Sequence, residues 1–336
     1  MTFDPDGPAT DGTLFGLGSP PEDALVHVIP VPFEATTSYR RGTRGAPTAI
    51  LEASAQVDLC DPEVDSPWRR GIALLPGDPE IGTLDARAEA DALAVIAAGG
   101  PADAQLAAAA ARVDACCAAM NQRVLAQVER TLAAGAIPAV LGGDHSVAFG
   151  GIVAAAAAVP GMGVLQVDAH CDLRVAYEGF TWSHASVAHN VLREADIRAL
   201  VQVGVRDVGA AEWSTATDRD DIHPWHDAHL SERLDGGTTW ATLCEEMIAP
   251  LPDHVWVSFD VDGLDPSLCP GTGTPVPGGL TWRQAMGLLR SLSRSGRRII
   301  GFDLCEVGVG EWDAIVGARL LYKLAGWAGT TWPVRA

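Results

Sequence analysis

Short apolar runs alternate along the chain with longer segments in which apolar residues recur at helical spacing. The apolar runs are rich in Val, Ile and Leu, and this composition is typical of strands that are buried on both faces. These runs predict strands at about 24–31, 137–141, 163–168, 199–205, 254–260 and 298–303.

Helical segments lie between most of these strands. Pro47 suits the first turn of a helix that continues to about Ala55. Thr281 begins Thr-Trp-Arg-Gln, a capping box that opens a helix to about Leu292. Further helical patterns lie at about 119–134, 147–158, 184–195 and 320–326. Strands that alternate with helices predict an α/β fold whose mostly parallel sheet is covered on both faces.

The chain is expected to fold as one domain. Its 336 residues would allow about two domains, but no segment has the composition of a linker. We expect a loose N-terminal arm over residues 1–23 and a single α/β domain over 24–336. The Ala-rich stretch 86–119 is interpreted as a surface helical region rather than a hinge, with a break between helices at 94–101.

The formal net charge of −20, with a pI near 4.7, argues against binding to nucleic acid or to anionic membranes. The seven cysteines are odd in number and form no C-x-x-C pair, so neither a disulfide framework nor a zinc ribbon is indicated. No basic segment followed by an apolar one opens the chain, and no apolar run is long enough for a membrane span. The sequence therefore predicts a protein of the cytoplasm.

The most informative polar residues follow the strand predicted at 163–168. Asp168, His170 and Asp172 form an Asp-x-His-x-Asp motif, and on an extended chain these side chains point to one face. An imidazole between two carboxylates is a good site for a divalent metal. Taken alone, the motif leaves a hydrogen-bonded turn as the alternative.

Two further strands end in acidic or imidazole groups. His145 follows the run 137–141, and Asp260 and Asp262 follow Val-Trp-Val at 255–257. In parallel α/β sheets, ligands bind outside the carboxyl ends of the strands, so these groups are expected to converge. The resulting candidate ligands are His145, Asp168, His170, Asp172, Asp260 and Asp262.

Six ligands are too many for one catalytic zinc, which usually takes three protein ligands and a water. They suit two ions bridged by carboxylates. Because oxygen ligands dominate and no thiolate cluster is present, two Mn²⁺ ions are favoured over zinc, with Ni²⁺ or iron as alternatives.

These motifs resemble the signatures of the ureohydrolase family, which comprises the arginases and agmatinases. The resemblance extends over about 26–324 and rests on Gly-Gly-Asp144-His145-Ser, Asp168-Ala-His170-Cys-Asp172 and Ser-Phe-Asp260-Val-Asp262-Gly-Leu-Asp-Pro, with further matches at 42–47, 270–280 and 302–307.

The resemblance implies a three-layer α/β/α fold with about eight strands in its central sheet, a binuclear manganese centre, and assembly into homotrimers or homohexamers. By analogy, Asp168 and Asp260 bridge the two ions. His145 and Asp172 complete one ion site, and His170 and Asp262 complete the other.

The family reaction hydrolyses a guanidinium group to urea and an amine. Glu306 matches the family glutamate that pairs with the guanidinium, and His184 matches the histidine that carries protons to the leaving amine. The resemblance assigns to Asp172 the transfer of the proton of the attacking water. Without the resemblance, His184 could equally be a surface histidine and Glu306 a structural carboxylate.

The substrate is predicted to be agmatine, which yields putrescine and would place the chain in polyamine biosynthesis. Arginases usually carry Asn where this chain has Arg174, and the segment from Asp172 to Ser186 resembles the agmatinase-like branch. Arg174 is a candidate substrate-binding residue. It could be neutralised by Glu178, or it could hold the carboxylate of a substrate such as 4-guanidinobutyrate. Aminopropylagmatine and arginine are further alternatives.

Two other functions fit the fold less well. A non-catalytic partner subunit would be expected to lack one or more metal ligands, yet all six are present, together with Glu306 and His184. A related deacetylase-type hydrolase with one zinc would lack the second Asp-x-Asp pattern and the guanidinium-binding glutamate.

Overall fold

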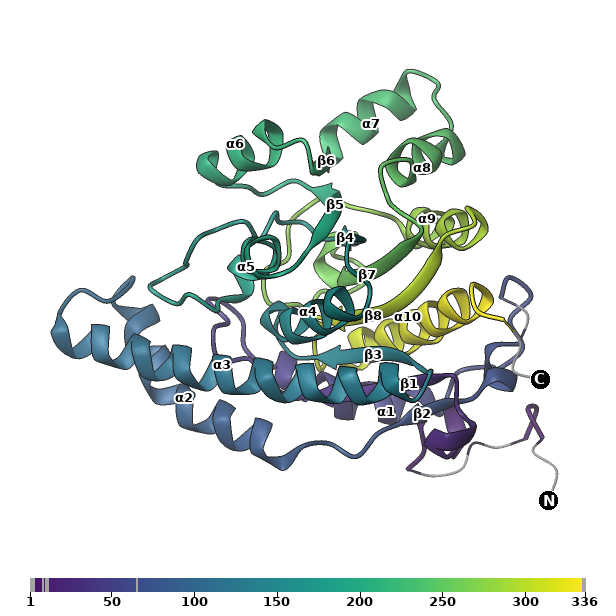
Figure 1. Ribbon diagram of the computed structural model, residues 1–336, viewed down its shortest axis with the longest axis horizontal. Coiled ribbons are helices and arrows are strands. Elements are labelled where there is room, and N and C mark those ends of the chain that lie inside the picture. Colours follow the sequence, from purple (N-terminus) through teal and green to yellow (C-terminus); the bar gives the residue numbers. More distant parts are fainter. Residues whose placement is uncertain (1–3, 8, 10–11, 65, 334–336) are drawn as a thin grey trace.

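The computed structural model describes residues 4–7, 9, 12–64 and 66–333, and its centre is one sheet of eight parallel strands (Figure 1). The strand order is β2-β1-β3-β8-β7-β4-β5-β6. The strands are β1 (Val26–Val31), β2 (Ile72–Leu74), β3 (Ile137–Gly142), β4 (Met162–Val167), β5 (Ile197–Val205), β6 (Ile222–His226), β7 (His254–Asp260) and β8 (Arg298–Cys305).

All six predicted strands are present, whereas the two edge strands β2 and β6 were not predicted. β2 has only three residues. β6 contains two histidines and Pro224, and four of its five residues are only partly buried. Edge strands tolerate proline and polar side chains because one side of their backbone has no partner strand. β2 is too short, and β6 too polar, to give the continuous apolar signal of a central strand.

Helices cover both faces of the sheet, which confirms the predicted three-layer α/β/α architecture (Figure 1). α1, α8, α9 and α10 lie on one face; α3, α4 and α5 lie on the other, with α2 packed along α3. The helices are α1 (Ala46–Ser54), α2 (Pro79–Ala97), α3 (Ala104–Ala133), α4 (Ala148–Ala158), α5 (Val187–Glu194), α6 (Ala210–Asp218), α7 (Asp227–Asp235), α8 (Trp240–Ile248), α9 (Trp282–Arg294) and α10 (Glu311–Thr330).

Side chains of the central strands alternate between the two layers. Leu165 and Val167 of β4 pack with α9 and α10, whereas Val164 packs with α4 and α5. Trp256 of β7 is fully buried under α4, and Gly301 on β8 leaves it room because a Cβ there would collide with the indole ring. The indole Nε1 donates to Asp303 at 2.6 Å, which ties this packing to the site described below.

The expectation of a loose arm is wrong for the segment around Leu14. Leu14 and Phe15 are buried in the core, and the Phe15 ring lies 4.9 Å from that of Tyr322. The backbone N–H of Phe15 also donates to Ser54 Oγ at 2.9 Å. Two apolar side chains therefore anchor a segment whose composition suggested a free arm.

The Ala-rich region is helical and broken where predicted, between α2 and α3. α3 is longer than the pattern indicated, because Asp103 caps it by accepting the N–H of Leu106 at 2.8 Å. One side of the region packs inward, through Ala92 and Ala109 among others. Within the described residues, no helix combines the length and the apolar character needed to cross a bilayer.

The order of the strands places four loops together at the centre of the sheet. The chain builds β1, β2 and β3 on one side, crosses to β4, and then builds β5 and β6 outward. β7 and β8 return later to fill the gap between β3 and β4. The carboxyl ends of β3, β8, β7 and β4 are therefore neighbours at a topological switch point, where α/β sheets bind their ligands.

Candidate metal centre and substrate pocket

The loop after β4 carries the Asp-x-His-x-Asp motif. The carboxylate of Asp168 accepts the backbone N–H of His170 at 2.6 Å, which closes a tight turn. Asp172 has a φ of 52°, a left-handed conformation that is uncommon for a residue other than glycine. This turn brings the Asp172 side chain back toward His145, whose Nδ1 lies 2.9 Å from Asp172 Oδ2.

The loop after β3 places His145 in the middle of the carboxylates. Its Nδ1 lies 3.0 Å from Asp168 Oδ2 and 3.4 Å from Asp260 Oδ2. The other ring nitrogen, Nε2, lies 2.9 Å from Ser258 Oγ, and that hydroxyl donates to Asp303 at 3.0 Å. Because Ser258 uses its proton on Asp303, its oxygen can accept one from Nε2, an arrangement that leaves Nδ1 available to bind a metal ion.

A second group of ligands lies on the other side of Asp168. His170 Nδ1 is 3.5 Å from Asp168 Oδ1 and 3.1 Å from Asp262 Oδ2. Asp260 Oδ1 accepts the N–H of Asp262 at 2.8 Å, which fixes the loop after β7. The two oxygens of Asp168 therefore face two different histidines, as a carboxylate shared by two neighbouring ion sites would.

The donor set fits two divalent cations. His145 and the four aspartates are at most 4 % exposed, and among the described residues no lysine or arginine pairs with those aspartates. Among the described residues, His145 Nδ1 is buried without a partner in hydrogen-bond geometry, although oxygens of Asp168 and Asp172 lie within 3.0 Å of it. Buried carboxylates and an orphaned imidazole nitrogen are costly unless cations bind them. Two triplets have the spacing of a metal site: His145, Asp168 and Asp260, and Asp168, His170 and Asp262.

The same crowding shifts the pKa values of the side chains in the cluster. Burial and the neighbouring charge of Asp168 raise the pKa of Asp172 to about 7. Burial opposes the charge of His170, but Asp262 and Asp168 outweigh it and raise the pKa of His170 to about 12. Binding of divalent cations to these groups would therefore release protons.

Glu306, at the end of β8, offers a free carboxylate oxygen beside the metal cluster. Its Oε1 accepts the backbone N–H of His145 at 3.0 Å, whereas its Oε2 is buried and has no partner in the described part of the chain. Glu306 has a φ of 62°, and Gly273 leaves space for Oε2 because a Cβ there would lie 2.9 Å away. Burial and the charges of Asp144 and Asp262 raise the pKa of Glu306 well above its usual range. Such a group is poised to bind a cation.

His184 is tied to the buried loop that follows β1. Its backbone N–H donates to Thr36 Oγ1 at 3.0 Å, and its Nδ1 lies 3.4 Å from the same oxygen. Thr36 in turn donates to Asp144 at 3.0 Å. Burial and the charges of His170 and His145 lower the pKa of His184 to about 4, so its ring is neutral. The sequence patterns did not single out Thr36, because it lies in a loop without a chemical motif.

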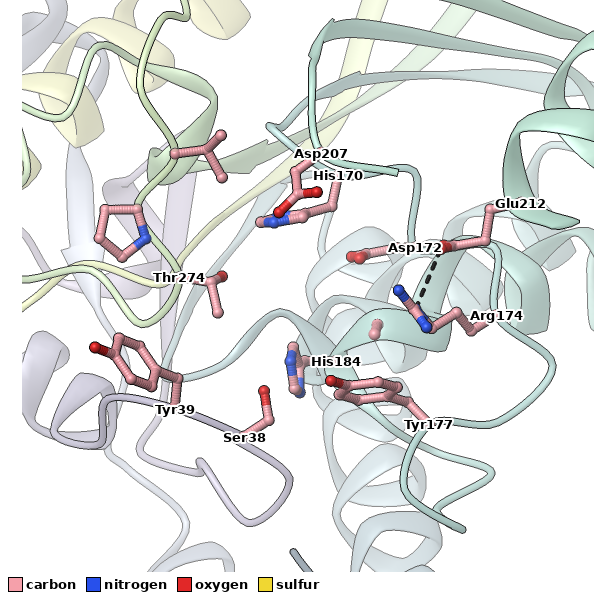
Figure 2. A pocket seen from close by; sticks show the side chains of 13 residues that line it. Ser38, Tyr39, His170, Asp172, Arg174, Tyr177, His184, Asp207, Glu212 and Thr274 are labelled. Carbon is pink, nitrogen blue, oxygen red and sulfur yellow. Dashed lines mark ion pairs between the residues drawn. The ribbon is translucent and has the colours of Figure 1, made fainter. Parts of the chain in front are cut away.

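A cavity of about 270 Å³ opens over the cluster (Figure 2). His170, Asp172 and His184 line it, as does Arg174, which was predicted to bind substrate. The counter-ion of Arg174 is not Glu178 but Glu212, whose Oε2 lies 3.1 Å from Arg174 Nε. Glu212 comes from α6, a helix that was not predicted.

Comparison with known proteins agrees with this geometry. The sequence matches the Arginase family over residues 24–325. The chain belongs to the arginase family. It is 31 % identical over 324 residues to the N(1)-aminopropylagmatine ureohydrolase of Thermus thermophilus, covering 93 % of this chain and 92 % of that protein.

Two solved structures share the fold. The agmatine ureohydrolase of Thermoplasma volcanium superposes with a TM-score of 0.73 at 23 % identity, covering 96 % of this chain and 95 % of the other. The proclavaminate amidino hydrolase of Streptomyces clavuligerus gives a TM-score of 0.72 at 25 % identity, covering 96 % and 99 %. The resemblance to the ureohydrolases, the enzyme class and the predicted fold are thereby confirmed at the level of the family.

Proposed function

We propose that this arginase-family chain is a binuclear manganese hydrolase that cleaves a guanidino compound to urea and an amine, with agmatine as its substrate and putrescine as its product. The observation that carries the proposal is the free Oε2 of Glu306. Among the described residues it is a buried carboxylate oxygen without a partner, and the other oxygen of the same carboxylate accepts the N–H of His145, one of the metal-ligand candidates that converge there. A guanidinium held there would have its central carbon next to the metal cluster.

Six residues would hold the ions: His145, Asp168, His170, Asp172, Asp260 and Asp262. Divalent ions bound by this set would lower the pKa of a water molecule toward neutrality and so supply the nucleophile. Four carboxylates and two imidazoles, without a thiolate, favour Mn²⁺ over zinc.

The chain's own side chains supply binding and proton transfer. Glu306 pairs with the guanidinium and orients its planar carbon. Asp172 lies in the cavity wall and accepts the proton of the attacking water. The C–N bond to the alkyl chain then breaks, and the departing amine nitrogen takes a proton through His184, which lines the same cavity. The products are urea and the alkylammonium ion.

The size of the pocket and the similarity to ureohydrolases support agmatine as the substrate. The cavity of about 270 Å³ suits a small linear substrate. The Thermus relative is named for N(1)-aminopropylagmatine, so a longer guanidino amine is the first alternative. We further propose that the chain acts in the cytoplasm, in polyamine biosynthesis, as a homotrimer or homohexamer.

Urea release from the manganese-loaded protein tests the proposal. Agmatine is expected to be cleaved faster than arginine, 4-guanidinobutyrate, 3-guanidinopropionate or aminopropylagmatine, and metal analysis is expected to find two ions per chain. If two metals are bound and none of the five compounds yields urea, the proposed function is wrong. One ion per chain would contradict the six-ligand assignment.

Replacing Thr36 by valine should lower kcat about tenfold, since positioned acid–base groups contribute roughly 10²–10⁴-fold and His184 would lose part of its orientation. The valine keeps the shape of threonine but removes the oxygen that binds both His184 and Asp144. Steady-state urea release at saturating agmatine measures the effect. Thr36→Ser retains the hydroxyl and should retain most of the rate; equal rates for serine and valine would rule out this role of the hydroxyl.

A further inference from the structure

Positive and negative side chains are unevenly distributed on the cavity wall beyond the metal cluster. Three charged side chains stand there from separate parts of the chain: Arg174, Asp207 and Glu212. Figure 2 shows Arg174 and Asp207 reaching into the same opening from different loops. The balance among these three decides which substrate tail the pocket prefers once the guanidinium is held by Glu306.

The positive charge of Arg174 is already neutralised within the protein. Glu212, only 7 % exposed, lies 3.1 Å from Arg174 Nε. Glu212 also accepts the backbone N–H groups of Leu173 and Gly209, both at 3.1 Å, which fixes its position. The guanidinium of Arg174 stacks on the Tyr177 ring with 4.7 Å to the ring centroid. A substrate carboxylate would have to compete with this internal partner.

The carboxylate of Asp207, unlike the guanidinium of Arg174, is available to a ligand. Its side chain is exposed in the cavity, and among the described residues its carboxylate has no hydrogen-bond or ion-pair partner. The neighbouring cation, Arg206, cannot neutralise it at short range. All three guanidinium nitrogens of Arg206 donate to backbone carbonyls, including those of Asp262 at 2.6 Å and Val276 at 2.9 Å.

The loop that carries Asp207 is held rigidly. The backbone N–H groups of Arg206 and Asp207 both donate to the carbonyl of Ala169, at 2.8 and 3.1 Å. The Arg206 bonds add three further attachments, to Gly204 at the end of β5, to the loop after β7 and to Val276. Because the backbone that carries Asp207 is fixed, less conformational freedom is lost when its side chain binds a ligand.

We propose that Asp207 binds the cationic tail of the substrate and makes this chain select guanidino amines over guanidino acids. The inference rests on the proposed ureohydrolase function and names the residue that sets its substrate class. A protonated amine at the far end of agmatine gains the carboxylate of Asp207, whereas a carboxylate at that end meets repulsion.

The test compares agmatine with 4-guanidinobutyrate, two substrates of similar length and opposite tail charge, on the manganese-loaded protein. Asp207→Asn should reduce the ratio of kcat/KM values, agmatine over 4-guanidinobutyrate, by about tenfold, through a higher KM for agmatine, as expected for loss of one charge-assisted bond. Asp207→Lys should lower the ratio further. Asp220→Asn removes an equal charge from the exposed loop before β6, at the amino ends of the strands, and should leave the ratio unchanged.

Calorimetric titration with putrescine separates the tail subsite from catalysis. Wild-type and Asp220→Asn proteins should bind putrescine with equal affinity, and Asp207→Asn should bind it about tenfold more weakly. Equal affinities in all three proteins, or an unchanged substrate ratio in Asp207→Asn, would overturn the role of Asp207. Absence of urea with every substrate, together with weakened putrescine binding in Asp207→Asn, would instead count against the proposed hydrolysis and in favour of the tail subsite.

Discussion

Asp260→Asn is expected to lower urea release by about a thousandfold and to reduce the bound metal to one ion or fewer per chain. Removing partners that merely support metal ligands costs about 10–100-fold, and Asp260 is itself a ligand candidate, 3.4 Å from His145 Nδ1. The amide has almost the same shape as the carboxylate, so the loss follows from charge rather than from packing. Metal analysis after dialysis, together with the rate of urea release, measures both effects.

A matched control lies in the same loop. Asp265→Asn removes the same charge, but Asp265 caps the turn at Ser267, whose N–H it accepts at 2.9 Å, and it belongs to neither of the two ligand triplets found among the described residues. That variant should keep two ions and most of the rate. A fully active Asp260→Asn protein with two bound ions would place the catalytic centre elsewhere.

Glu306→Gln is expected to keep both metal ions and yet to lose about a hundredfold in kcat/KM for agmatine. Hydrogen bonds to charged groups contribute about 1.5–3 kcal/mol, or roughly 10–150-fold. Glutamine can still accept the N–H of His145, so the strained backbone at residue 306 and the position of His145 should persist. The variant thus separates binding of the guanidinium from binding of metal.

Metal content and kcat/KM together test the prediction for Glu306→Gln. Glu311→Gln removes an equal charge from the exposed first turn of α10 and should change kcat/KM by less than about twofold. Loss of metal in Glu306→Gln would show that Glu306 supports the cluster instead of the substrate. An unchanged kcat/KM would remove Glu306 from substrate binding.

Local patterns predicted the parts of the site that lie on central strands. Asp168 and Asp260 each follow an apolar run, and the rule that parallel strands end at one edge was enough to bring their loops together. At the edges of the sheet, β2 is too short and β6 is too polar to be recognised in this way. The helices α6, α7 and α8 were missed because each is short and mostly polar on its outer side.

Contacts between residues that lie far apart along the chain could not be predicted from the sequence. Glu178 is close to Arg174 along the chain, yet its φ of 49° belongs to a turn, and the ion pair of Arg174 forms with Glu212 of α6. Thr36 binds His184 across 148 positions of sequence. Such pairings depend on how loops fold back over the sheet, and composition or periodicity does not encode that path.

The late arrival of β7 and β8 links completion of the fold to completion of the site. Without them the sheet consists of two separate halves, β2-β1-β3 and β4-β5-β6, because only β8 and β7 bridge β3 and β4. The same two strands deliver Asp260, Asp262 and Glu306. A nascent chain that ends before residue 254 therefore has neither a continuous sheet nor a full set of ion ligands. The six proposed ion ligands are complete once the chain has reached Asp262, whereas closure of the sheet and Glu306 follow only with β8, so a partly synthesised chain lacks part of the proposed site.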